Sequence, residues 1–330
     1  MSVAQQRDFA GRDKVVFRRL LLAWYQESQR KLPWRGATDP YHILVSEIML
    51  QQTRVAVVEE RYRKFIAQFP SAESLARAKE ATVLAAWSGL GYYRRARNLH
   101  AAAKEIVRRG SFPRTTRELM ALPGVGRYTA AAVASIAFGE PVAVVDGNVK
   151  RVIDRVVNRK AALAGSNAEK HYWEIAGKLL DWQSPGDFNQ AMMELGALVC
   201  LPAQPLCHAC PIANLCGARG PTEKAGRPAR RKAELHYALA RKNGSVLLRQ
   251  RNKQSSLMPG MWELPEIEDA NESKLPLLKL RHAITTTDYT VFVHAGNKKR
   301  QTDRWVPLRS VYRLPLTGLT RKIIRGLRDA

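Results

Sequence analysis

The 330-residue sequence contains no apolar run long enough to span a membrane, and its first residues, MSVAQQRDFAGRDK, lack the apolar core of a signal peptide. We therefore expect a cytoplasmic protein without a membrane partner. Acidic residues are also scarce, because 29 Asp and Glu stand against 54 Lys and Arg. The excess is shared by residues 1–220 and 221–330. This balance favours a polyanionic partner over a protein that is basic only for solubility.

Cysteine is absent outside one short segment, where Cys200, Cys207, Cys210 and Cys216 are spaced C-x6-C-x2-C-x5-C. A reducing compartment disfavours disulfides, so this segment predicts a metal site. Zinc usually draws on two C-x2-C pairs, whereas one pair flanked by wider arms suits an iron–sulfur cluster. The spacing favours the cluster, and zinc remains the alternative.

The length and a hydrophobic content of 45% provide for two or more globular domains. Residues 218–235 shift toward Gly, Pro and basic residues, which predicts a linker. Beyond it, alternating apolar residues on both sides of Asn243–Gly244 predict a β-hairpin, and two later segments also have β character.

A glycine-rich turn precedes an Ala-rich segment in LPGVGRYTAAAVASIA, residues 122–137. Pro123, Gly124 and Gly126 predict a tight hairpin, followed by an amphipathic helix that begins near Arg127. Unpaired N–H groups at such a helix start can hold a phosphate of a nucleic-acid backbone. A simple turn without a ligand is the alternative.

Two carboxylates lie in contexts that suit acid–base chemistry. Asp39 and Pro40 predict the start of a helix over YHILVSEIMLQQTRVAVV, residues 41–58, which places Glu47 among apolar neighbours. Burial would raise the pKa of Glu47 and make it a general acid, although a surface position is the commoner fate of a glutamate. Asp146 follows the apolar run VAVV, where it is either a helix N-cap or a second carboxylate facing Glu47.

The segment SGLGYYRR, residues 88–95, interrupts a helical pattern. Its glycines release the backbone, its tyrosines offer stacking faces and its arginines offer phosphate contacts. This combination suits a wedge in a base stack, with tyrosines packed in a core as the alternative.

These motifs belong to a longer ordered series: LPWR (32–35), SEIMLQQTRV (46–55), GLGYYRRARNLH (89–100), LPGVGRYTA (122–130), VDGNVKRV (145–152), FNQAMMELGALVC (188–200) and the cysteine segment. The series resembles the MutY family of adenine DNA glycosylases, within the helix-hairpin-helix superfamily that also includes endonuclease III. The resemblance implies a mainly α helix-hairpin-helix glycosylase domain with an Fe–S cluster loop over 1–217. It further implies a basic linker over 218–235 and a C-terminal α+β Nudix-like domain over 236–330.

The resemblance implies roles for five residues. Glu47 would protonate the extruded adenine at N7 and later activate water. Asp146 would stabilise the oxocarbenium-like sugar, through a transient covalent bond as in retaining glycosidases, and Asn148 would position it. Gln52 and Tyr92 would intercalate opposite or beside the damaged guanine, which helps offset the unstacking of the extruded base.

Further DNA contacts would come from Arg35 and from Leu122, Gly124, Val125 and Gly126 of the hairpin. The four cysteines would hold a [4Fe-4S] cluster that is structural or senses DNA. The expected partner is double-stranded DNA with adenine opposite 8-oxoguanine or guanine, bound by a monomer in the bacterial nucleoid.

The residue after LPGVGR decides between two chemistries. Bifunctional relatives carry a lysine there, whose amine forms a Schiff base with the sugar, whereas this chain has Tyr128. We therefore expect base excision without strand cleavage. Two alternatives are an endonuclease III-like glycosylase and lyase acting on damaged pyrimidines, and a non-catalytic Fe–S DNA-binding module.

The C-terminal part resembles the Nudix-like domain of the same family more weakly. After Leu264–Pro265 it lacks the R-E-x-x-E-E run of a Nudix hydrolase, so we expect recognition instead of phosphohydrolysis. Where the family has a Phe-Ser-His triplet associated with 8-oxoguanine, this chain reads Ile284, Thr285 and Thr286. Thr285 keeps a hydroxyl and Thr286 loses the imidazole, so we expect lesion recognition that is weaker or differently wired.

Overall fold

The computed structural model describes residues 11–157, 166–221, 229–255, 257–267, 275–284, 286–296 and 300–326. Contacts divide the chain into two units, Met1–Ala76 with Ala101–Ala225 and Arg77–His100 with Gly226–Ala330. Thr285, one of the expected lesion contacts, lies outside the described residues. Within the described parts, no helix is both long and apolar enough to cross a membrane.

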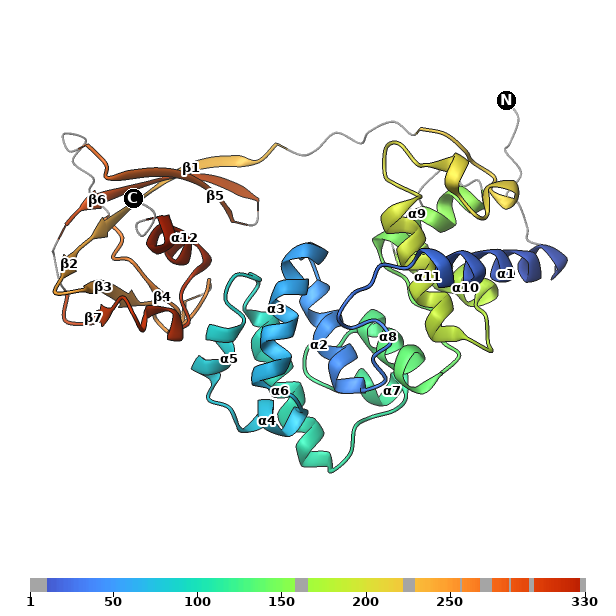
Figure 1. The fold of residues 1–330 in the computed structure, drawn as a ribbon, viewed down its shortest axis with the longest axis horizontal. Coiled ribbons are helices and arrows are strands. Elements are labelled where there is room, and N and C mark those ends of the chain that lie inside the picture. The colour runs from blue at the N-terminus through green and yellow to red at the C-terminus, as the bar shows by residue number, and fades with distance from the viewer. Residues whose placement is uncertain are drawn as a thin grey trace. The chain divides into compact units, whose positions relative to one another are not determined.

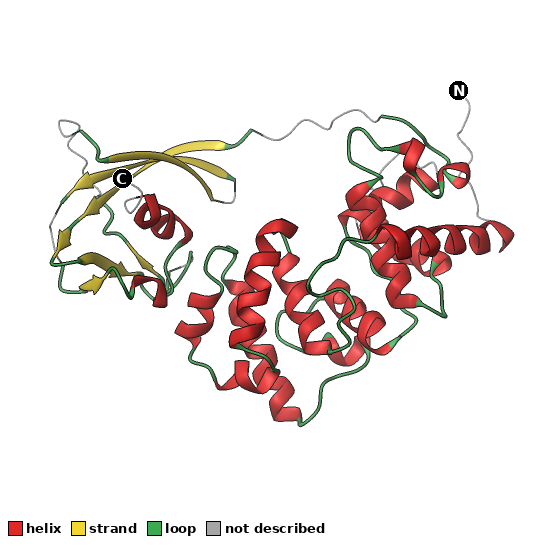
Figure 2. Cartoon of the chain, viewed as in Figure 1, coloured by secondary structure: helices red, strands yellow, loops and turns green. Residues whose placement is uncertain are grey.

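The first unit is helical, as Figures 1 and 2 show. Its elements are α1 (Gly11–Ser28), α2 (Pro40–Leu50), α3 (Val55–Gln68), α4 (Ala72–Arg77), the later part of α6 (Arg94–Arg109), α7 (Thr116–Leu119), α8 (Arg127–Phe138), α9 (Gly147–Val156), α10 (Ser166–Leu179), α11 (Pro185–Leu198) and the 3-10 turns η1 (Cys207–Ala209) and η2 (Ala213–Leu215). One core cluster joins α1, α8, α9, α10 and α11 through fully buried residues such as Phe17, Ile153 and Phe188.

The start of α2 is as predicted, because the Asp39 side chain accepts a hydrogen bond of 2.8 Å from the N–H of Tyr41. The expectation of one helix through residue 58 was wrong. Helix α2 ends at Leu50, and α3 begins at Val55. Between them Gln52 has φ 55°, a left-handed conformation that a continuous α-helix does not accept.

The predicted hairpin and the start of its helix are confirmed, whereas the expectation of an amphipathic helix was wrong, because residues 129–135 of α8 are buried on every face. Gly124 has φ 74°, and Gly126 is the N-cap residue of α8, which begins at Arg127. Most of the small side chains of α8 are buried, so α2 and α11 pack closely against it. The hairpin therefore fixes where α8 begins, and the packing of α8 brings α2 and α11 together.

The second unit contains α5 (Glu80–Ala86), the start of α6 and two sheets. In the first sheet, β6 (Thr287–Ala295) pairs in parallel with β1 (Arg231–Leu239) and antiparallel with β5 (Leu278–Ile284). The second contains β2 (Arg241–Lys242), β3 (Ser245–Gln250), β4 (Trp262–Glu263) and β7 (Asp303–Pro307). The turn η3 (Val311–Arg313) and helix α12 (Gly318–Gly326) complete its core.

The predicted hairpin at Asn243–Gly244 is confirmed, because both residues have positive φ, 47° and 67°, between β2 and β3. The α+β character of the C-terminal part is also confirmed. Strand β1 begins at Arg231, inside the segment whose composition predicts a linker. The division at 217 and 235 otherwise stays a prediction.

Candidate active site

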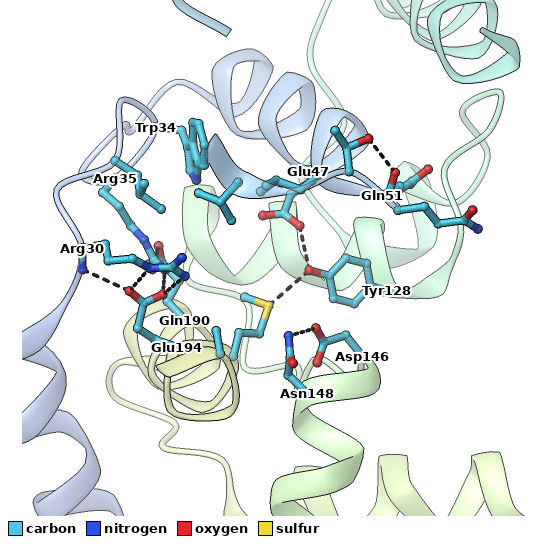
Figure 3. Close-up of a pocket in the computed structure, with 17 residues that line it drawn as sticks. Arg30, Trp34, Arg35, Glu47, Gln51, Tyr128, Asp146, Asn148, Gln190 and Glu194 are labelled. Carbon is cyan, nitrogen blue, oxygen red and sulfur yellow. Dashed lines mark hydrogen bonds and ion pairs between the residues drawn. The ribbon is translucent and has the colours of Figure 1, made fainter. Parts of the chain in front are cut away.

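A cavity of about 340 Å³ lies in the first unit, between the segment that follows α1 and helices α2, α8, α9 and α11 (Figure 3). Among its lining residues are six of the predicted site residues: Arg35, Glu47, Gln52, Tyr128, Asp146 and Asn148. Residues that are distant in the sequence thus converge on one site.

Glu47 lies on α2 and is only 6% exposed, as its apolar neighbours predict. Its Oε2 accepts a hydrogen bond of 2.8 Å from the Tyr128 hydroxyl. Burial raises the pKa of Glu47, and the hydrogen bond from Tyr128 and the charge of Arg35 oppose this effect without cancelling it. A carboxyl group of this kind retains its proton to a higher pH than a free glutamate, as a general acid requires.

Tyr128, on the first turn of α8, has two acceptors for one proton. Its hydroxyl lies 2.8 Å from Glu47 Oε2 and 3.1 Å from Met193 Sδ. Burial raises the pKa of Tyr128 well above its ordinary value, and the charges of Glu47 and Asp146 act in the same direction. The phenol therefore stays neutral and serves as a hydrogen-bond donor in the cavity.

Asp146 is the N-cap residue of α9 and also lines the cavity that contains Glu47. Its Oδ1 accepts a bond of 2.7 Å from the N–H of Val149 and caps α9, while Oδ2 accepts a bond of 3.1 Å from Asn148 Nδ2. Arg151 Nη2 donates in turn to Asn148 Oδ1 at 2.8 Å. Helix α11 approaches closely here, because a Cβ on Gly196 would lie 2.6 Å from Asn148 Cβ. Both oxygens of Asp146 are thus held on the wall that faces the cavity.

Arg35, an expected DNA contact, takes part in an ion-pair network that sequence reasoning missed. Its Nη2 lies 2.8 Å from Glu194 Oε2, its Nη1 donates to Gln190 and Tyr25, and Arg30 Nε lies 2.8 Å from Glu194 Oε1. Burial alone would raise the pKa of Glu194, but bonds from Arg30 and the charge of Arg35 outweigh it and lower this pKa. The signal for this network was the i, i+4 spacing of Gln190 and Glu194, which places both on one face of α11.

The two expected wedge residues share an unusual backbone. Gln52, which lines the cavity, has φ 55°, and Tyr92, which belongs to the second unit and is 49% exposed, has φ 46°. Non-glycine residues in this region carry strain, which commonly marks functional sites.

In the hairpin, Leu122 and Val125 are buried, whereas Gly124 and Gly126 are exposed. A Cβ added at Gly126 would meet nothing within 4 Å, so the approach to the start of α8 is open. Thr286 lies exposed in the second unit, and its carbonyl accepts a bond of 3.1 Å from the N–H of Arg231.

The four cysteines are free of disulfides and line one small cavity beside Arg155. Arg155 Nη1 donates to Cys200 Sγ at 3.1 Å, and the N–H of Gly220 donates to Cys207 Sγ at 3.4 Å. In the part of the chain that the structure describes, no three His, Cys, Asp or Glu side chains meet as ligands of a single ion. The thiols surround a space instead, an arrangement that fits a cluster in which each thiolate bonds a different iron.

Comparison with known proteins identifies relatives of the helical part. Residues 45–178 match the HhH-GPD superfamily base excision DNA repair protein model. The chain is 48% identical over 217 residues to an adenine DNA glycosylase of Rattus norvegicus, covering 62% of this chain and 42% of that relative. It is 34% identical over 241 residues to an adenine DNA glycosylase of Buchnera aphidicola subsp. Schizaphis graminum, covering 72% of this chain and 69% of that relative.

Among solved structures, a thermostable thymine-DNA glycosylase superposes with a TM-score of 0.56 at 32% identity, covering 63% of this chain and 97% of that one. These matches confirm the helix-hairpin-helix fold predicted for the helical part. The chain spans less than half the length of the rat relative.

Proposed function

Because the chain belongs to the adenine DNA glycosylase family of the helix-hairpin-helix superfamily, we propose that it hydrolyses the N-glycosidic bond of adenine in double-stranded DNA. The substrate is adenine opposite 8-oxoguanine or guanine. One observation carries the proposal: Glu47, with a raised pKa, and Asp146, held by two hydrogen bonds, face the same cavity. The pair provides a proton donor and an anion in one pocket.

In the proposed reaction, the adenine leaves the base stack and enters the cavity, at a cost of a few kcal/mol. Glu47 gives its proton to N7, so the base leaves as a neutral molecule when the bond between C1′ and N9 breaks. Asp146 stabilises the positive charge that develops on the sugar, by its own charge or by a transient bond to C1′. Water then attacks C1′, and the Glu47 carboxylate accepts the proton that the water loses.

Tyr128 accounts for base excision without strand cleavage. Its neutral phenol donates to Glu47 at 2.8 Å and has no amine that could attack C1′. No Schiff base forms at this position, and the product is an abasic site in an intact strand. An endonuclease III-like lyase would need an amine here.

The experiment compares duplexes that contain adenine opposite 8-oxoguanine, adenine opposite guanine, and thymine glycol, each with and without alkali. Our proposal predicts breaks at adenine only after alkali and no reaction at thymine glycol. Breaks without alkali, or reaction at thymine glycol, would favour the endonuclease III-like alternative.

We also propose that Cys200, Cys207, Cys210 and Cys216 hold a [4Fe-4S] cluster. The support is their shared cavity, together with the hydrogen bonds to Cys200 and Cys207, which are of the kind that stabilises cluster sulfurs. When bound, such a cluster would crosslink the segment after α11 through these four residues.

The C-terminal unit would recognise the lesion, as a Nudix-like domain without hydrolase activity. Three features support this role: the two sheets with α12, the absence of the R-E-x-x-E-E run from the sequence, and the exposed Thr286 between β5 and β6. Adenine opposite 8-oxoguanine should therefore react faster than adenine opposite guanine.

A further inference from the structure

The loop that contains Tyr92, residues 88–93, is hydrogen-bonded at both ends to Leu316, just before α12, and at Ser88 also to Arg321 on α12. The Tyr93 hydroxyl donates to the carbonyl oxygen of Leu316 at 3.1 Å, and Ser88 Oγ donates to the same oxygen at 3.2 Å. Arg321 Nε, on α12, donates to Ser88 Oγ at 2.8 Å. Ser88 is fully buried and Tyr93 is 4% exposed. These bonds join residues more than two hundred positions apart, all within the second unit.

Between its two ends, the loop is held by contacts of the neighbouring Arg95 side chain. The Arg95 guanidinium lies 5.5 Å from the ring centroids of both Trp87 and Tyr92. Its Nη2 donates to the carbonyls of Leu90 at 2.9 Å and Gly91 at 3.3 Å. Burial lowers the pKa of Arg95 to about 10, so it remains a cation at neutral pH. The loop is therefore constrained by a local cation and by a distant helix.

Tyr92 itself is the strained and exposed member of the loop, with φ 46° and 49% exposure. A non-glycine residue keeps such a backbone only where the surrounding structure imposes it. Arg95 contacts the ring, but the ends of the loop are fixed at Ser88 and Tyr93. The bonds to Leu316 and Arg321 thus fix the chain on both sides of Tyr92.

We propose that Arg321 is a positioning residue for Tyr92, so that α12 of the C-terminal part sets the conformation of the tyrosine that contacts DNA. The role of Tyr92 at DNA rests on the proposed function, whereas the fastening of the loop does not. A hydrogen bond from a charged donor to a buried acceptor shifts an equilibrium by roughly ten-fold or more. Its loss should release the loop by about that factor.

The first test measures hydrogen–deuterium exchange of residues 88–95 in the full chain without DNA. Arg321→Gln should speed exchange in this segment roughly ten-fold. Arg325→Gln, on an exposed position of the same helix, is the matched control and should leave exchange at the wild-type rate. If Arg321→Gln lowers the yield of folded protein, Ser88→Ala is the second variant. It removes the bond from Arg321 together with the bond that Ser88 donates to Leu316, so it should speed exchange at least as much.

The second test measures single-turnover adenine release from adenine opposite 8-oxoguanine. Arg321→Gln should weaken DNA binding roughly ten-fold and leave the rate at saturating enzyme within about three-fold, because the carboxylates are unchanged. In a Tyr92→Ala background the same change should have almost no further effect. A purely structural role for Arg321 would instead add its effect to that of Tyr92→Ala.

The exchange measurement and the adenine-release measurement test different claims. Wild-type protein that releases no adenine would refute the proposed function, while the exchange experiment would still decide the fastening of the loop. Exchange of residues 88–95 that is the same in wild type, Arg321→Gln and Ser88→Ala would overturn the inference. So would full additivity of Arg321→Gln and Tyr92→Ala.

Discussion

Replacing Glu47 by Gln removes the proton donor while keeping the size of the side chain and an oxygen that accepts from Tyr128 at the 2.8 Å contact. Adenine release should fall by at least ~10²–10⁴-fold, the contribution typical of general acid–base catalysis. In free energy this is about 3–5 kcal/mol of transition-state stabilisation. Binding of the lesion duplex should stay within a few-fold, because the DNA contacts are unchanged.

The pH dependence of the wild-type enzyme follows from the same group. If Glu47 is the acid, release requires its protonated form, so the rate should decline as pH rises through its raised pKa. The Gln variant has no such proton, so its residual rate should lack this decline. The measurement is single-turnover release, scored as alkali-sensitive breaks across the pH range. Glu59→Gln, on α3, is the control and should match wild type, because the Glu59 side chain is 41% exposed and pairs only weakly with Arg63 at 3.6 Å.

The pH dependence of the free energy of unfolding is an independent check on the raised pKa of Glu47. The folded state holds the Glu47 proton more tightly than the unfolded chain does, because burial raises the pKa. The stabilising contribution of this carboxyl is complete below the unfolded value of about 4.3 and is lost as pH rises through the folded value. Glu47→Gln should therefore gain stability over wild type at pH 8 and not at pH 4. Near-wild-type release by this variant would refute the assignment of Glu47 as the acid.

Three further predictions test other parts of the site. Asp146→Asn keeps a residue suited to the N-cap of α9 but removes the negative charge, so release should fall at least ~10²-fold with an unchanged melting temperature; a drop in stability alone would assign Asp146 only a capping role. Tyr128→Phe removes a bond that lowers the Glu47 pKa, so the alkaline decline of the pH–rate profile should move to higher pH; movement to lower pH would contradict the hydrogen-bond account. Purified protein should be brown and absorb blue light broadly, and Cys210→Ser should lose the colour and much of the stability; colourless protein with stoichiometric zinc would show that the metal is zinc.

Local signals in the sequence were sufficient for the features that depend on neighbouring residues. The glycines of the hairpin, the Asp39–Pro40 helix start and the apolar neighbours of Glu47 each act within a few positions, and the structure agrees with all three. Asp146 was ambiguous for the same reason, since its capping role is local but its cavity role depends on a separate helix.

The features that were missed arise from long-range contacts. Arg35 pairs with Glu194, which lies 159 positions away, and Tyr128 contacts Met193 across 65 positions. The i, i+4 spacing on α11 places Gln190 and Glu194 on one face, but no local pattern identifies Arg35 or Tyr128 as the partner. The sequence did not predict the end of helix α2 at Leu50, because apolar residues resume at helical spacing beyond it. The residue with left-handed backbone at this point is Gln52, and not a glycine that would have indicated a turn. The fastening of Ser88 to Arg321 likewise depends on how the second unit folds.

The most direct test of the central claim uses a duplex with adenine opposite 8-oxoguanine. The duplex is incubated with the protein, and the mass of the adenine-containing strand is then measured. Hydrolysis of the glycosidic bond predicts a full-length strand that has lost adenine and gained the elements of water, with free adenine in equal amount. An unchanged strand mass, or fragments formed before any alkali is added, would contradict the account.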